Sequence, residues 1–252
     1  GFTRWSEEAP CPSEGLPSGY ARALARRAVF EATGPAPGPV HLNLPFREPL
    51  VPATIDPALA PAHAPLEPAA AMGQVTRDDY RVLAGSLRGI ARGVLIFGPD
   101  AWDARLAEAV EALAASLGWP VLADPASGLR AGAGLQRALI PGADALLRDP
   151  DTAAALHPEL IVRFGGAPTS KAIATWVALH DSADLWLVDP AAGFRDPQHR
   201  ASRMLRTGAR QFCGAAHVGS GQPSAGAQAW FARWRHADRV ARVALGEALA
   251  AA

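Results

Sequence analysis

The chain has 252 residues, a formal net charge of zero, 49% apolar residues and 19% charged residues. This size and balance are ordinary for a globular protein and suffice for one large α/β domain, or for one domain with an appendage. A neutral chain lacks the electrostatic footprint of a protein that binds DNA or RNA, and no apolar run approaches the roughly 18 residues of a membrane span. We therefore expect neither a nucleic-acid partner nor a membrane span.

Cysteine and histidine usage gives no sign of a metal centre. Cys11 and Cys213 are the only cysteines, and the seven histidines are dispersed without CxxC or HExxH spacing. We expect no structural zinc and no disulfide framework. The opening GFTRWSEEAP has no basic or apolar leader segment, so the expected location is the cytoplasm.

The first predicted elements are a helix and a strand. Residues 18–33 place Tyr20, Leu24 and Ala28 at helical spacing, and residues 40–44 form an apolar run. From residue 45 to about residue 72 the chain contains seven prolines and few periodic signals. Proline fixes φ and lacks an N–H donor, so we expect an extended, semi-rigid connector there and not part of a sheet.

Beyond this connector, apolar strands alternate with amphipathic helices. Apolar runs separated by such helices are typical of a parallel sheet that is covered on both faces. We predict a doubly wound, mostly parallel, Rossmann-like α/β domain. The predicted strands cover residues 93–97, 120–123, 160–164 and 185–188, and the helices cover residues 102–117, 170–179 and 225–252.

The predicted elements divide the chain into four segments. Residues 1–44 are expected to be the end of a preceding domain, and residues 45–72 the connector. Residues 73–215 are expected to form the central α/β domain, and residues 216–252 a C-terminal helical segment.

Ligands of an open parallel sheet bind beyond the carboxyl ends of its strands, which directs attention to four loops. The most informative is GGAPTSK, residues 165–171. Its glycines permit a tight turn, Thr169 or Ser170 can cap the following helix, and Lys171 then lies in the first turn. Exposed N–H groups, the positive end of the helix dipole and an ammonium group would converge there, which predicts a site for a carboxylate or phosphate.

Lys171 is the single lysine of the chain, because arginine occupies every other cationic position. The alternative is that Lys171 is a solvated surface residue and that the glycines only form the turn. The loop is not a P-loop, since Ser170 and Ala172 stand where that motif requires a glycine and a hydroxyl. No G-x-G-x-x-G follows the strand at residues 93–97 either.

Charged residues in the other loops are weaker candidates. Asp124 and Asp189 directly follow predicted strands, where aspartate can act as an acid but commonly forms a turn or caps a helix. Arg130 and Arg195 could bind a carboxylate through their guanidinium groups, or pair with Asp124 or Asp196 in structural roles. No Ser/His/Asp arrangement and no carboxylate pair with catalytic spacing is visible.

Several stretches in order resemble one enzyme family. They are RWSEEAPCP, GPVHLNLPFREPL, WPVLADPASGLR, RFGGAPTSKAIATW and FRDP, and they span roughly residues 1–200. Together they resemble the MenD family, the thiamine-diphosphate-dependent 2-succinyl-5-enolpyruvyl-6-hydroxy-3-cyclohexene-1-carboxylate (SEPHCHC) synthases of menaquinone biosynthesis.

The resemblance implies a chain that holds part of a three-domain enzyme. Residues 1–44 would end a pyrimidine-binding domain, and residues 216–252 would lead to a diphosphate-binding domain. The full enzyme would use thiamine diphosphate and Mg²⁺ to decarboxylate 2-oxoglutarate and join the product to isochorismate, and it would be a homodimer or homotetramer. The thiamine-activating glutamate and the Mg²⁺ motif belong to the other two domains. We therefore expect no catalytic residue, no bound cofactor and no activity in this chain alone.

The resemblance also associates the lysine of the PTSK stretch with a carboxylate-bearing substrate. This role maps onto Lys171, with Thr169 and Ser170 beside it. Some relatives carry an arginine after that lysine, and Ala172 in its place puts a second cationic contact in doubt. Two alternatives remain open, a central module that binds FAD or ADP and a purely structural module that spaces two cofactor domains.

Overall fold

The structure is a computed structural model that describes residues 3–13, 16, 19–33, 38–48, 50, 77–100, 105–131, 134–190, 195–196 and 200–251. These residues belong to two compact units, one that ends at residue 50 and one that begins at residue 77. Most of the predicted connector lies outside the described residues, as do residue 18 and residues 102–104 of two predicted helices.

The first unit is a small βαβ arrangement, in which the two strands pair in parallel with Trp5 opposite Val40. The guanidinium of Arg27, on the connecting helix, lies 4.4 Å from the centre of the Trp5 ring. The sequence does not predict the first strand, because only every second side chain of WSEE is partly buried and the run is not apolar. The elements are β1 (Trp5–Glu8), α1 (Tyr20–Thr33) and β2 (Val40–Asn43).

The second unit is built on a five-stranded sheet in which every pair of neighbours is parallel. The strand order is β4-β3-β5-β6-β7, so the prediction of a doubly wound parallel sheet is confirmed. All residues of β3, β4 and β5 are buried, as expected for strands covered on two faces. The strands are β3 (Gly93–Phe97), β4 (Val121–Ala123), β5 (Leu160–Phe164), β6 (Asp184–Val188) and β7 (Arg203–Leu205).

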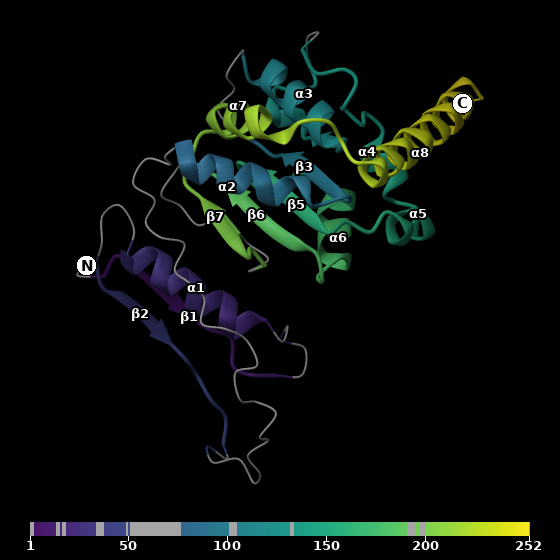
Figure 1. The fold of residues 1–252 in the computed structure, drawn as a ribbon. Coiled ribbons are helices and arrows are strands. Elements are labelled where there is room, and N and C mark those ends of the chain that lie inside the picture. The colour runs from purple at the N-terminus through teal and green to yellow at the C-terminus, as the bar shows by residue number, and fades with distance from the viewer. Residues whose placement is uncertain are drawn as a thin grey trace. The chain divides into compact units, whose positions relative to one another are not determined.

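Helices cover both faces of this sheet. On one face α7 packs against both α2 and α3, and on the other α6 packs with α4 and α5 (Figure 1). No helix among the described residues is long and apolar enough to cross a membrane. The helices are α2 (Arg77–Arg88), α3 (Leu106–Leu117), α4 (Ala143–Leu146), α5 (Pro150–Ala155), α6 (Lys171–Leu179), α7 (Ala209–Ser220) and α8 (Ala225–Ala250), with a 3-10 turn η2 (Pro125–Ser127).

Aromatic rings join the sheet to its helices on the α7 face. Phe97 of β3 and Phe164 of β5 stack with ring centres 4.3 Å apart, and Phe212 of α7 meets Phe164 edge-on at 5.3 Å. Phe212 is fully buried. Burying rings of this size makes a large contribution to stability, so this contact fixes α7 against the two central strands.

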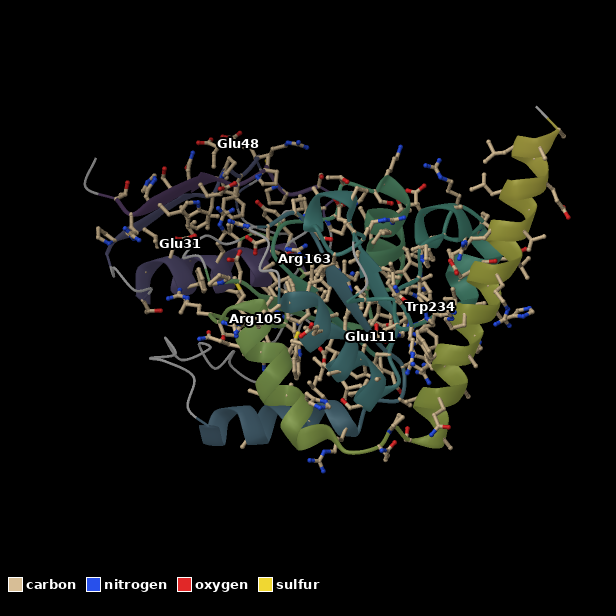
Figure 2. All side chains as sticks on the ribbon, turned by 90° about the horizontal axis from the view of Figure 1, so that it is seen from above. Glu31, Glu48, Arg105, Glu111, Arg163 and Trp234 are labelled. Atoms are coloured by element: carbon tan, nitrogen blue, oxygen red, sulfur yellow. The ribbon has the colours of Figure 1, made fainter. Side chains whose placement is uncertain are left out.

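A cluster of tryptophans attaches the first half of α8. Trp234 meets Trp176 of α6 and Trp230 edge-on, with ring centres 5.5 and 5.8 Å apart, and it points from α8 into the unit (Figure 2). Trp230 Nε1–H donates to the Gly93 carbonyl at 2.9 Å, whereas Trp234 Nε1 is buried and has no hydrogen-bond partner among the described residues. The last turns of α8 are exposed, with Leu249 70% exposed.

The two tryptophans allow a matched test of the hydrogen bond to Gly93. Trp230→Phe and Trp234→Phe remove the same atoms from buried rings on one helix. We expect Trp230→Phe to cost about 1–3 kcal/mol more, because it alone leaves a carbonyl without its donor. Chemical denaturation of both variants would measure the difference. Equal losses, or a larger loss for Trp234→Phe, would contradict the bond assignment.

Candidate functional site

The order of the strands places the candidate site. The chain passes from β3 to β4 at one edge and then returns to β5 on the other side of β3. From β3 and from β5 the chain proceeds to strands on opposite sides, which makes a topological switch point between them. Open α/β sheets bind their ligands at such points. The predicted loops after β3, β4, β5 and β6 all leave this end of the sheet, and the loop after β6 is described only in part.

At the switch point itself the two loops close against each other. Gly98 N–H donates to the Phe164 carbonyl at 2.9 Å, and Gly166 N–H donates to the Pro99 carbonyl at 3.0 Å. A Cβ on Gly98 would overlap the Gly166 carbonyl, and Gly165 has a φ of +68°. The glycines are therefore required for a tight turn and close backbone packing, and their N–H groups are used within the protein.

A cavity of about 230 Å³ lies beside the closed loops. Its lining includes Phe97, Phe164, Asp100, Ser127 and residues 208–211 at the start of α7. Pockets for drug-sized ligands and cofactors usually measure roughly 300–1,000 Å³. The volume of this cavity, lined by described residues, lies below that range.

Asp124 connects the end of β4 to the loop before α6. Its Oδ1 accepts the N–H of Ala126 at 2.9 Å, and its Oδ2 accepts both the N–H and the hydroxyl of Thr169, at 2.6 and 2.7 Å. The side chain is 1% exposed. Asp124 is thus a turn cap, as one of the two readings of the sequence expects, but it also binds a second loop.

The surroundings of Asp124 keep it ionised. Burial raises the pKa of this carboxyl, but hydrogen bonds from the Thr169 hydroxyl and from the N–H groups of Ala126, Thr169 and Ser170 together lower that pKa below its usual range. A buried carboxylate is stable here because both of its oxygens accept hydrogen bonds.

Ser170 starts α6 and binds a second carboxylate. Its Oγ accepts the N–H of Ile173 at 3.1 Å, which caps the helix, and its hydroxyl donates to Asp144 Oδ1 of α4 at 2.6 Å. The Ser170 bond, followed by the contacts from Arg148, lowers the pKa of Asp144. A serine hydroxyl carries one proton, so in this arrangement Ser170 has none left to donate to a ligand.

Lys171 is the first residue of α6, and its side chain is exposed. The Lys171 ammonium group makes no hydrogen bond or ion pair with another described residue. The structure therefore brings the three predicted site residues together in one strand-to-helix loop but distinguishes their roles. Thr169 and Ser170 donate to internal carboxylates, while Lys171 keeps its donors at the positive end of the helix.

The other sequence candidates have partners inside the protein. Arg195 Nε lies 3.2 Å from Asp189 Oδ2, and Arg130 donates to the carbonyls of Ala123 and Pro141 at 3.4 and 3.0 Å. Both arginines thus have internal partners, but the partners differ from the predicted ones, since Arg130 binds main-chain carbonyls and not Asp124. The carboxylates that pair with Arg195 are Asp189 and, at 4.0 Å, Asp100, whereas the sequence pointed to Asp196.

The sequence interpretation does not identify a buried charge cluster that begins at Arg163. This residue of β5 is labelled in Figure 2 and is 2% exposed. Its guanidinium donates to the Arg195 carbonyl. Burial lowers the pKa of its guanidinium, while the charges of Asp196 and Asp189 oppose that effect. The signal was present in the sequence as the only charged residue inside the apolar strand LIVRF.

The same cluster fixes the far end of α6. Asp196 accepts the N–H groups of Arg200 and Ala201, both at 2.7 Å. The Arg200 guanidinium donates to the carbonyls of Val177 and, at 2.8 Å, His180, which end α6. A cation at these free carbonyls is favourable, so charged groups hold both ends of the helix that carries Lys171.

Asp124 makes stability depend on pH. The pKa of Asp124 is lower in the folded than in the unfolded chain. Its contribution to the free energy of unfolding is therefore present above about pH 4 and is lost as the pH falls through the folded-state pKa. We expect Asp124→Asn to lower the free energy of unfolding by about 1–3 kcal/mol at pH 7, since one N–H must then face an amide NH₂. Denaturation at several pH values should show the deficit shrinking below about pH 4, and a deficit that persists unchanged in acid would contradict this role.

Comparison with known proteins finds matches over nearly the whole chain. A SEPHCHC synthase of Geobacillus thermodenitrificans is 36% identical over 99% of this chain and 43% of its own length. The corresponding synthase of Chloroflexus aurantiacus is 36% identical over 95% of this chain and 41% of its own. The chain thus spans about two fifths of the length of the curated relatives it matches.

Solved structures and a family model give two further comparisons. Among solved structures, benzoylformate decarboxylase from Polynucleobacter necessarius is 16% identical over 88% of this chain and 39% of that chain, with a TM-score of 0.36. The family described as "Middle domain of thiamine pyrophosphate" matches residues 87–249. The chain therefore belongs to the thiamine pyrophosphate enzymes, contains their middle domain, and has curated relatives that are named SEPHCHC synthases.

Proposed function

We propose that this chain is the central region of a SEPHCHC synthase, a thiamine-diphosphate-dependent transferase. The full-length enzyme would decarboxylate 2-oxoglutarate and add the resulting succinyl unit to isochorismate. The names of the relatives and their 36% identity over nearly the whole chain support this proposal. We further propose that the full-length protein is cytoplasmic and a homodimer or homotetramer.

Lys171 is the residue through which this chain would contact a substrate. Both proposed substrates carry carboxylates, and an exposed ammonium at the start of a helix attracts a carboxylate through its charge and the helix dipole. The observation that supports this role is that, in the described part of the chain, the neighbouring Thr169 and Ser170 donate to Asp124 and Asp144 while Lys171 has no carboxylate partner.

The cofactor would be held by other parts of the enzyme. When bound, thiamine diphosphate supplies an electron sink for decarboxylation. No group of three His, Cys, Asp or Glu side chains within the described ranges could hold Mg²⁺. These residues do not fit a metal site, and we assign no step to them. We expect no turnover from this chain alone, which an assay of the purified chain with both substrates and cofactors would check.

Replacing Lys171 tests the substrate contact. In the full-length enzyme, we expect Lys171→Ala to raise the KM for isochorismate about 10-fold to 100-fold, because a hydrogen bond to a charged group contributes roughly 1.5–3 kcal/mol. The affinity for thiamine diphosphate should change little. Steady-state kinetics and a cofactor titration would measure the two effects.

Arg239→Ala is a suitable control, because it removes one exposed cation from α8. It should leave both parameters unchanged. Unaltered kinetics in Lys171→Ala would contradict the substrate contact and favour a solvated lysine in a structural spacer. A thermal shift with ADP, or a yellow, flavin-containing preparation, would instead favour the nucleotide-binding alternative.

A further inference from the structure

We infer that Asp124 is a positioning residue for Lys171, acting through Thr169, an inference that rests on the proposed substrate contact of Lys171. The backbone of Thr169 lies two residues before Lys171 and is held by Asp124 Oδ2 through an N–H bond of 2.6 Å and a hydroxyl bond of 2.7 Å. Asp124 would thus determine the position of the backbone from which the Lys171 side chain extends. It would touch neither substrate nor cofactor.

Asp124 is itself held in place by hydrogen bonds. Asp124 is 1% exposed directly after the buried strand β4, and its other oxygen is held by the Ala126 N–H at the start of η2. The Asp124 N–H donates to the Phe97 carbonyl of β3 at 2.8 Å. The carboxylate therefore ties the loop before α6 to the edge of the sheet.

A second connection acts on the next residue. The Ser170 hydroxyl donates to Asp144 of α4 at 2.6 Å while its oxygen caps α6. Two successive residues are thus each bound to a carboxylate from a different element, and neither hydroxyl has a proton free for a ligand. The structure assigns Thr169 and Ser170 to positioning, and leaves the substrate contact to Lys171.

The geometry also explains why a carboxylate is needed at residue 124. Each of its two oxygens accepts a backbone N–H, from Ala126 and from Thr169. Asparagine has one oxygen and one NH₂ group, so it must place a donor against one of these N–H groups in either orientation. Asp124→Asn therefore keeps the shape of the side chain and breaks one of the two connections.

The test uses the full-length enzyme and isochorismate kinetics. We expect Asp124→Asn to raise the KM for isochorismate about tenfold with a much smaller change in kcat, since displacing a binding group by a fraction of an ångström weakens its contact. Thr169→Val, which removes only the hydroxyl, should raise KM about threefold. Thr169→Ser keeps the hydroxyl and should raise KM less than Thr169→Val does.

A double-mutant cycle separates positioning from general damage. If Asp124 acts through Lys171, then Asp124→Asn and Thr169→Val should have little further effect on KM in the Lys171→Ala background. If the defect were purely structural, its fold-increase in KM would multiply with the fold-increase caused by Lys171→Ala. Melting temperatures at pH 7 identify any variant that is poorly folded, and Thr169→Val then carries the cycle alone.

The outcomes distinguish this inference from the function on which it rests. In one outcome, Lys171→Ala raises KM while Asp124→Asn and Thr169→Val either have no effect or have effects that multiply with it. That result overturns the positioning role and leaves the substrate contact intact. Unchanged kinetics in Lys171→Ala overturn the substrate contact and the positioning role together. Equal KM increases for Thr169→Val and Thr169→Ser would also contradict positioning through the hydroxyl.

Discussion

A single buried carboxylate connects the sheet to the loop on which the candidate site is built. Asp124 accepts hydrogen bonds from Ala126 in its own loop and from the N–H and hydroxyl of Thr169. Burying an ion is costly unless its hydrogen bonds are made, so the charge of Asp124 and the position of Thr169 depend on each other. The start of α6 at Lys171, two residues beyond Thr169, depends on this interaction.

The helix that begins there is held at both ends by charge and caps. Ser170 caps its first turn and binds Asp144, while the Arg200 guanidinium binds the carbonyls at its end. Arg200 is in turn fixed through its N–H to Asp196, beside the buried Arg163. Lys171 therefore projects from a helix that is held at both ends. In the proposed substrate contact, this would reduce the entropy lost when the ammonium binds a carboxylate.

How far the sequence predicts the fold depends on how local each signal is. The bounds of β3 and β5 follow from apolar runs that are buried on both faces. The sequence also predicts a helix cap at Thr169 or Ser170, and the structure assigns the N-cap of α6 to Ser170. The strands β1 and β7 are three or four residues long and contain charged side chains, so they become strands only through their neighbours. In α7, a glycine interrupts a weak apolar pattern, and the packing against α2 and α3 decides the helix.

The sequence by itself determined the fold class, the loop of the candidate site and the choice of Lys171. Periodicity and caps are properties of adjacent residues, and the single lysine is a property of the composition. Only the tertiary structure decided the partners of the neighbouring hydroxyls. Asp124 and Thr169 are 45 residues apart and Ser170 and Asp144 are 26 apart, so no local pattern links them. A hydroxyl donates its one proton to a single acceptor, and the fold places internal carboxylates at that acceptor position.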